Sequence, residues 1–167
     1  MIVMGYPAIG KTTLAEKSLE YIDLEATSFF VQRSTKNGYK TDREEYWYKV
    51  YGNMAIDLHK QGYTVLISSN QKVRQYLIEC KSQGIITEAD KICILYPSLK
   101  LKNYWITKVK KRYIAENNLK NERAYLRVNN YFEQDIRDLS ASPFINIEIT
   151  DRYYDLEYLI NQVKEQS

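Results

Sequence analysis

Cysteine and histidine are scarce in this sequence of 167 residues, which contains two cysteines and a single histidine. Cys80 and Cys93 lie thirteen positions apart, and no CxxC motif or neighbouring histidine accompanies them. This spacing predicts two reduced cysteines that pack in the interior, and it argues against a disulfide framework or a zinc site. His59 stands beside Lys60 near an expected helix end, where a surface or capping role is favoured over catalysis.

Long apolar runs and a strong charge of one sign are also missing. No apolar run approaches the roughly 18 residues of a membrane-spanning helix, and the chain starts with a strand-like segment rather than a signal peptide. A net charge of +3 mildly favours an anionic ligand; nucleic acid is a possible partner that this charge does not by itself imply. We therefore expect a single cytoplasmic domain, residues 1–167, with no membrane partner.

The most informative stretch stands at the beginning of the chain. It has the spacing G-x-x-x-x-G-K-T of a phosphate-binding loop and reads Gly5-Tyr6-Pro7-Ala8-Ile9-Gly10-Lys11-Thr12-Thr13. An uncharged apolar run precedes it, and a helix-like segment with Leu14, Ala15 and Leu19 on its inner face follows. Such a strand, loop and helix start direct backbone N–H groups at an anion. We expect these nine residues to bind ATP, with Lys11 on the β- and γ-phosphates and Thr12 on a phosphate-bound Mg²⁺.

The rest of the chain alternates apolar strands with amphipathic helices. We expect strands at 21–26, 63–69, 91–96 and 144–149, and helices at 43–60, 71–82, 99–117, 121–139 and 155–164. Residues 27–42 are expected to form a long polar loop. The order predicts an α/β fold in three layers, α/β/α, around a five-stranded parallel sheet. Ligands of such sheets bind at the carboxyl ends of the strands, which places Asp23, Ser68 and Tyr96 beside the loop.

With this order and the loop at Gly5–Thr13, the chain resembles the small P-loop kinases, which include adenylate-kinase-like enzymes and polynucleotide 5′-kinases. A closer resemblance is to the small ATP-binding kinase-like proteins of phages and prophages of Gram-positive bacteria. It rests on Asp23-Leu24-Glu25-Ala26-Thr27-Ser28, on Gln61-Gly62-Tyr63 through Ser68-Ser69, and on Tyr96-Pro97 followed by Trp105. The resemblance implies an ATP phosphotransferase that uses ATP and Mg²⁺.

The resemblance also implies roles for further residues. In the resembling kinases an acidic residue at the end of the second strand accepts the proton of the attacking hydroxyl or holds Mg²⁺, which points to Asp23 here. Glu25, two residues on, would share its face of the strand. A helical hairpin after the fourth strand is the lid in those enzymes, so residues 99–139 form the expected lid. Its Lys108 and Arg112, spaced by four on one helical face, are expected to stabilise transition-state charge.

Three arginines are candidates for binding a phosphate on the acceptor. Arg33 and Arg43 flank the expected polar loop, which grips the acceptor in nucleotide kinases, and Arg74 follows the third strand. A guanidinium group suits a phosphate, although a solvated surface arginine remains the alternative for each. A nucleoside monophosphate is the first expected acceptor, and a polynucleotide 5′-hydroxyl is the second.

Two departures from the kinase pattern keep another class of function open. Ala8 replaces a glycine that many such kinases carry before x-G-K, and the third strand ends Ser68-Ser69-Asn70 without a carboxylate. The missing carboxylate disfavours AAA-type and motor ATPases, and the absence of an N-K-x-D sequence disfavours GTPases. The alternative is therefore a nucleotide-binding regulatory or interaction protein with little turnover.

Overall fold

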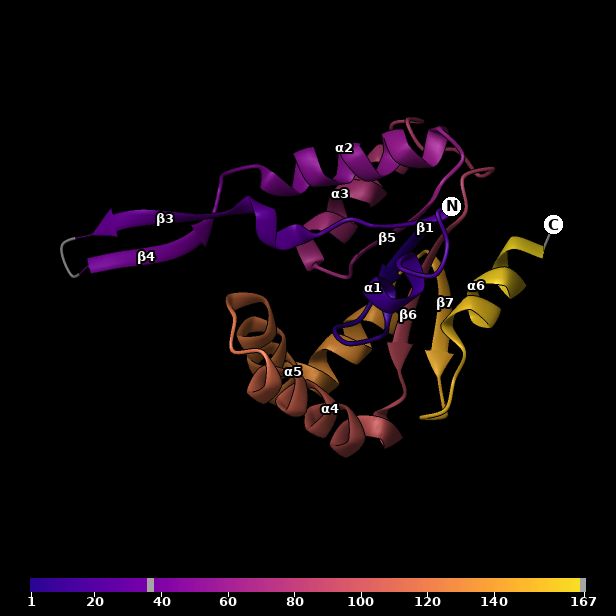
Figure 1. Ribbon diagram of the computed structural model, residues 1–167. Helices are drawn as coiled ribbons and strands as arrows, with labels where there is room; N and C mark the ends of the chain where they lie inside the picture. Colours follow the sequence, from indigo (N-terminus) through magenta and orange to yellow (C-terminus); the bar gives the residue numbers. More distant parts are fainter. Residues whose placement is uncertain (36–37, 166–167) are drawn as a thin grey trace.

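The computed structural model (Figure 1) describes residues 1–35 and 38–165, with the side chains of residue 30 and residues 32–42 left aside. The strands are β1 (Ile2–Gly5), β2 (Tyr21–Asp23), β3 (Phe30–Thr35), β4 (Gly38–Arg43), β5 (Thr64–Ser68), β6 (Ile92–Pro97) and β7 (Ile145–Ile149). The helices are α1 (Lys11–Ala15), α2 (Trp47–Lys60), α3 (Gln71–Ser82), α4 (Lys102–Ala115), α5 (Leu119–Ser140) and α6 (Leu156–Glu165). Two short 3-10 turns, Ala26–Phe29 and Leu99–Leu101, complete the set.

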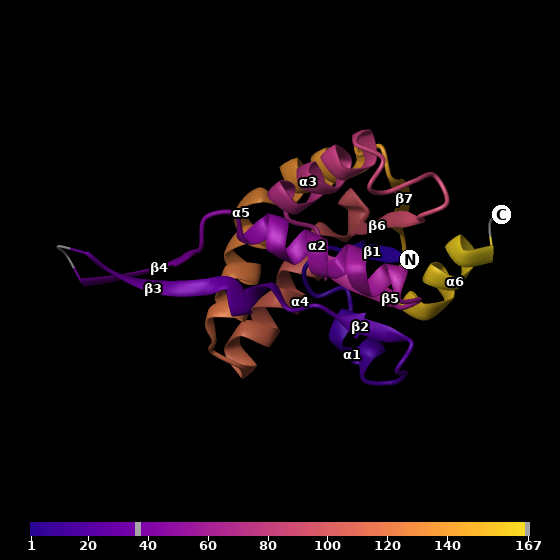
Figure 2. The same cartoon turned by 90° about the horizontal axis from the view of Figure 1, so that it is seen from above.

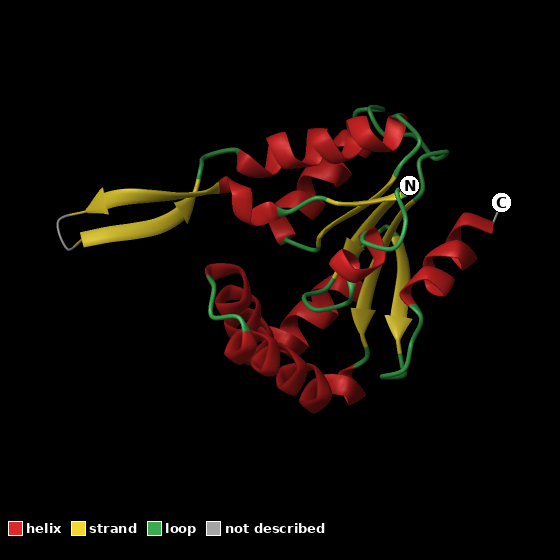
Figure 3. Ribbon diagram, in the orientation of Figure 1, coloured by secondary structure: helices red, strands yellow, loops and turns green. Residues whose placement is uncertain are grey.

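Five of these strands form one parallel sheet in the order β2-β5-β1-β6-β7. β1 lies at its centre, and Val3 pairs with Leu66 on one side and with Cys93 on the other. All residues of β1 and β6 are buried. Because successive side chains of a strand point to opposite faces, this burial requires helices on both faces, as Figure 3 shows. The predicted α/β fold with a five-stranded parallel sheet is confirmed.

The carboxyl ends of the parallel strands meet at one edge of the sheet. Gly5 pairs with Ser68 and with Leu95, and Asp23 pairs with Leu66. Four segments that lie far apart in the sequence therefore converge here, which is where ligands of open α/β sheets bind.

The segment expected to be a polar loop contains a β-hairpin instead. β3 and β4 pair in an antiparallel register that runs from Phe30 opposite Arg43 to Thr35 opposite Gly38. The hairpin extends away from the sheet in both Figure 1 and Figure 2. The prediction of a loop was wrong because these strands lack the alternation of apolar and polar residues that marks a half-buried strand. Residues 36 and 37, at the centre of the expected loop, lie outside the described residues.

Several element boundaries also differ from the prediction. α1 ends at Ala15, and Leu19, expected on its inner face, is 94% exposed. β2 ends at Asp23 rather than at residue 26. α2 starts at Trp47 rather than at residue 43, and Arg43 is instead the last residue of β4. The remaining strands, and α3 and α6, lie within two residues of their predicted limits. Apolar periodicity thus predicted the buried elements well and the short or exposed ones poorly.

The expected helical pair after β6 is present as α4 and α5, which pack along each other (Figure 1). The rings of Tyr113 and Tyr125 stack between them with their centroids 5.8 Å apart. α5 begins at Leu119, where the Asn118 side chain accepts a hydrogen bond from the backbone N–H of Asn121. This is a standard N-cap, and it turns the chain sharply between the two helices.

The cysteines are as predicted, since Cys80 and Cys93 are both buried and free. His59, in the last turn of α2, lies 2.9 Å from a carboxylate oxygen of Asp90 and also contacts the amino group of Met1. His59 thereby joins α2 to the loop that precedes β6. Within residues 1–35 and 38–165, no helix is long and apolar enough to cross a membrane.

Candidate functional site

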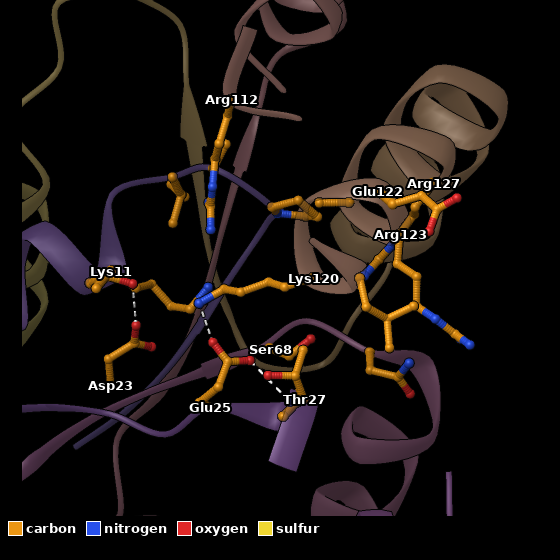
Figure 4. A pocket seen from close by; sticks show the side chains of 18 of the residues that line it. Lys11, Asp23, Glu25, Thr27, Ser68, Arg112, Lys120, Glu122, Arg123 and Arg127 are labelled. Carbon is orange, nitrogen blue, oxygen red and sulfur yellow. Dashed lines mark hydrogen bonds and ion pairs between the residues drawn. The ribbon is translucent and has the colours of Figure 1, made fainter. Parts of the chain in front are cut away.

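A cavity of about 1130 Å³, the main cavity, opens at the carboxyl edge of the sheet (Figure 4). The loop after β1 and the start of α1 form its floor, and the segment after β2 forms one wall. α4 and α5 form the opposite wall. The cavity therefore lies between the sheet edge and the helical pair, and its lining includes Lys11, Thr12, Asp23, Arg43, Lys108, Arg112 and Lys120.

The two glycines of the phosphate-loop pattern are required by the backbone. A Cβ atom on Gly5 would lie 2.7 Å from Cγ2 of Ile9 and 3.0 Å from Cδ of Lys11, because the loop folds back over the end of β1. Gly10 has a φ of 104°, in the left-handed region that favours glycine. Gly5 and Tyr6 do not line the cavity; Tyr6 is fully buried beneath the loop, with its ring edge-on to Phe132.

Ala8 also adopts a left-handed conformation, with a φ of 62°. This is the position at which the sequence departs from the glycine of many kinases. A residue with a Cβ atom in this conformation carries a strain of about 1–2 kcal/mol. The loop therefore keeps the backbone that a glycine would adopt, at a cost in stability.

Lys11 reaches into the main cavity from the start of α1. Burial lowers the pKa of its ammonium group, and the nearby carboxylates of Asp23 and Glu25 offset this only in part. Lys120 and Arg112 add further positive charge around it. An anionic ligand between these cations would offset their repulsion and favour the charged form of Lys11 despite its burial.

Thr12 and Asp23 meet directly at the edge of the cavity. The Thr12 hydroxyl donates a 2.6 Å hydrogen bond to a carboxylate oxygen of Asp23. Both groups are hard oxygen donors of the kind that Mg²⁺ prefers, so the donor set fits this ion. The described part of the chain holds no cluster of three or more His, Cys, Asp or Glu residues suited to a metal. Mg²⁺ would thus share its coordination between these two residues, phosphate oxygens and water.

Tyr51 of α2 fixes two strand ends beside the site. Its hydroxyl donates to the Leu24 carbonyl at 2.7 Å and accepts from the Ser68 N–H at 2.9 Å. The side chain is fully buried. Tyr51 lies within the helix expected at 43–60, but nothing in the sequence distinguishes a bridging hydroxyl from an ordinary aromatic packing residue.

Trp105 and Tyr154, which do not themselves line the main cavity, hold the loop after β1. Trp105 donates its indole N–H to the Pro7 carbonyl at 2.7 Å, and Tyr154 donates its hydroxyl to the Ile9 carbonyl at 2.8 Å. The two rings stack with their centroids 6.0 Å apart. Because a trans peptide places its N–H opposite its carbonyl, this arrangement directs the N–H groups that follow Pro7 and Ile9 away from the two rings. We call this pair the aromatic brace.

Lys108 and Arg112 lie one turn apart on α4, and both line the main cavity. The Lys108 ammonium lies 3.2 Å from the Tyr154 hydroxyl and 4.7 Å from the centroid of the Trp105 ring. Burial lowers its pKa. Figure 4 shows the Arg112 side chain directed toward Lys11. The expected basic face of the helix is therefore turned to the cavity.

Glu25 and Lys120 form an ion pair across the cavity (Figure 4). Because β2 ends at Asp23, the expectation that Glu25 shares a strand face with Asp23 was wrong; its carboxylate instead accepts from the Thr27 N–H at 3.0 Å. Burial alone would raise the pKa of Glu25, but Lys120 and the Thr27 amide bring it below the usual value. Sequence reasoning missed Lys120 as a site residue, since it appeared only as a polar residue between two helices.

The three candidate arginines lie in different places. Arg43 lines the main cavity, with its guanidinium carbon 4.0 Å from the centroid of the Trp47 ring, and Arg123 and Arg127 of α5 line the same cavity. Arg74 is turned away and donates to the Asp138 carbonyl at 2.8 Å. Arg33 lies on β3 opposite Lys40, and the structure describes only its backbone.

Comparison of the chain with protein-family models and with curated proteins gives no match in either case. The functional argument therefore depends on the geometry of the main cavity and on the chemistry of the residues that line it.

Proposed function

We propose that the protein is a kinase that transfers the γ-phosphoryl group of ATP to a nucleotide-type acceptor. The proposal depends on one observation. Lys11 lines the same cavity as the hydrogen-bonded pair of Thr12 and Asp23, at the carboxyl edge of a parallel sheet. The loop after β1 begins and ends at glycines that its geometry requires. This combination suits a bound triphosphate and its metal ion.

The chain's own residues divide the work of binding the donor. N–H groups of the loop after β1 and the Lys11 ammonium bind the β- and γ-phosphates. Thr12 would hold Mg²⁺, which neutralises phosphate charge when bound, and Asp23 would either share this ion or accept the proton of an acceptor hydroxyl. Lys108 and Arg112, on the opposite wall, would stabilise the charge that spreads over the transferred group. In this role α4 and α5 act as the lid over the phosphates.

The acceptor would occupy the part of the main cavity between Asp23 and Arg43. At about 1130 Å³ the cavity exceeds the roughly 300–1,000 Å³ of common small-molecule sites, which leaves room for a donor and an acceptor. A nucleoside monophosphate would place its phosphate near Arg43 and would need no general base. A polynucleotide 5′-hydroxyl would instead give its proton to Asp23.

The alternative is a nucleotide-binding regulatory protein with little turnover. It is favoured by the end of β5, where Ser68 and Asn70 line the cavity and no carboxylate follows the strand. Under this alternative ATP binds at Lys11, but no acceptor is phosphorylated.

A panel of acceptors separates the two functions. Binding of ATP with Mg²⁺ is measured by calorimetry, and ATP consumption is measured with deoxynucleoside monophosphates, nucleosides and 5′-hydroxyl oligonucleotides. Lys11→Ala should abolish both binding and turnover, whereas Lys17→Ala, a matched change of an exposed lysine just after α1, should alter neither. ATP binding by the wild type without phosphorylation of any acceptor would remove the kinase proposal.

A further inference from the structure

A second hollow of about 610 Å³, the side hollow, adjoins the main cavity. The two share Arg43, Asn70 and Arg123 as a common wall. The other walls of the side hollow come from 44–48, before and within the first turn of α2, and from Gln71 and Lys72 at the start of α3. A ligand seated in the main cavity can therefore continue past Arg43 and Arg123 without leaving the protein surface.

The side hollow combines positive charge with aromatic rings. Lys72 is exposed, and its ammonium lies 5.9 Å from the centroid of the Tyr48 ring. Tyr46 is 55% exposed and stands immediately before α2 with a φ of 62°. Cations bind phosphate groups, and exposed tyrosine rings stack with unpaired bases. The lining thus offers partners for both parts of a nucleotide.

The charges of the side hollow also limit what it can hold. Its lining contains three cations, Arg43, Lys72 and Arg123, together with the exposed carboxylates of Glu44 and Glu45. Three positive charges against two negative ones suit one phosphate and oppose a run of several. The side hollow therefore has the composition of a subsite for a single nucleotide.

We propose that the acceptor is the 5′ end of a single-stranded oligonucleotide, with its terminal nucleotide in the main cavity and the next nucleotide in the side hollow. The phosphate that joins the two would lie between Arg43 and Arg123, and the second base would stack on Tyr46 or Tyr48. This inference rests on the proposed function and favours a polynucleotide acceptor over a mononucleotide.

The reaction that this arrangement supports is a simple group transfer. The terminal 5′-hydroxyl oxygen forms a bond to the γ-phosphorus, and the bond from that phosphorus to the oxygen of the β-phosphate breaks. The hydroxyl proton passes to the Asp23 carboxylate, and ADP leaves.

A length series of acceptors tests the inference. Thymidine, thymidine monophosphate, a 5′-hydroxyl thymidine dinucleotide and the corresponding tetranucleotide are compared at fixed ATP and low salt. We expect kcat/KM to be about tenfold or more higher for the dinucleotide than for thymidine or thymidine monophosphate. One stacked base and one phosphate contact provide a gain of this size. The tetranucleotide should add less than about threefold, because Glu44 and Glu45 oppose further phosphates.

Two variants link the effect to the side hollow. Lys72→Ala and Tyr46→Ala should each raise KM for the dinucleotide several-fold and leave the KM for ATP unchanged. Lys60→Ala, which removes an exposed lysine at the far end of α2, is the matched control and should change neither value.

Equal efficiency for the dinucleotide and a single nucleotide, with no effect of Lys72→Ala, would overturn the inference and leave the kinase function standing. If no acceptor is phosphorylated, the fluorescence anisotropy of a labelled dinucleotide measures its binding and tests the side hollow by itself. Binding that weakens with Lys72→Ala would support the side hollow although the kinase function fails. Binding that is indifferent to both variants would overturn the side hollow as well.

Discussion

Thr12 and Asp23 join the start of α1 to the end of β2. Their 2.6 Å hydrogen bond leaves the carboxylate beside Lys11, within the space that a bound triphosphate would fill. The positions of Gly5 and Gly10 were predictable, because the close approach at Gly5 and the positive φ of Gly10 require glycine. Lys120 and Tyr51 were not, since their roles depend on which distant segments lie opposite them.

Asp23→Asn should separate binding from turnover. The amide keeps the size of the side chain but loses the charge that accepts a proton or holds Mg²⁺. We expect the Kd for ATP to stay within a few-fold and kcat to fall about 100-fold or more. Glu16→Gln, at an exposed carboxylate just after α1, is the control and should leave kcat unchanged. A variant Asp23→Asn with normal kcat would exclude Asp23 from the reaction.

The aromatic brace does not line the main cavity, yet changes in it should weaken nucleotide binding through the loop after β1. Trp105→Phe and Tyr154→Phe keep the stacked rings but leave the Pro7 or Ile9 carbonyl without its donor. Loss of about 1 kcal/mol in loop order corresponds to a roughly fivefold weaker Kd for ATP, measurable by calorimetry. Tyr153→Phe, a matched change of the neighbouring tyrosine, which is 78% exposed and does not line the main cavity, should leave the Kd for ATP unchanged. Unaltered ATP affinity in both brace variants would show that the loop holds its shape without them.

The left-handed backbone of Ala8 predicts that a glycine at this position stabilises the protein. Ala8→Gly relieves the left-handed strain and costs some unfolded-state entropy, so the free energy of unfolding should rise by about 0.5–1 kcal/mol. Ala15→Gly, in helical conformation, should instead lower it by a similar amount. Urea denaturation measures both, and a loss of stability in Ala8→Gly would contradict the strain inferred from its φ of 62°.

At the scale of elements, the buried parallel strands and the longer helices followed from apolar periodicity. β1 and β6 are continuous apolar runs, and such runs are buried on both faces whatever the connections between them. The β3–β4 hairpin escaped prediction because its strands pair with each other away from the sheet, so no apolar face was imposed on their sequence. Polar hairpins of this kind leave little trace in a hydrophobic pattern.

The ion pair of Glu25 and Lys120 ties the segment after β2 to the start of α5. The Glu25 side chain is 41% exposed, so solvent screening limits the pair to less than about 1 kcal/mol at neutral pH. Because the pKa of Glu25 is lowered by folding, its contribution is present above the unfolded pKa and is lost as pH falls through the folded pKa.

Glu25→Gln should therefore lower the free energy of unfolding slightly at pH 7, and the difference from the wild type should shrink as the pH falls through the lowered pKa of Glu25. Thermal denaturation across this range measures it. Lys120→Met should cause a similar loss, and the double variant should lose less than the sum of the two. A difference that does not shrink at all as the pH is lowered would show that the Glu25 carboxylate does not act through its charge.

At the scale of the whole molecule, the sheet edge and the helical pair enclose one space with two ends. Lys11, Lys108 and Arg112 supply positive charge at the end nearest the loop after β1, and Arg43 and Arg123 supply it where the main cavity adjoins the side hollow. The sequence predicted the sheet and the helical pair. It could not predict that Arg43, at the end of β4, and Arg123, on α5, lie along one wall, because that depends on the packing of α5 against β6.

The most direct test of phosphoryl transfer at this site is a single-turnover experiment with γ-labelled ATP. The protein is in excess over ATP, and a mixture of nucleotide and 5′-hydroxyl dinucleotide acceptors is present. Excess protein reveals chemistry even where product release is slow. We predict that label moves from ATP into an acceptor with the wild type and not with Lys11→Ala. Label that stays in ATP while ATP is demonstrably bound, or that appears only as free phosphate, would contradict the assignment of this site to phosphoryl transfer.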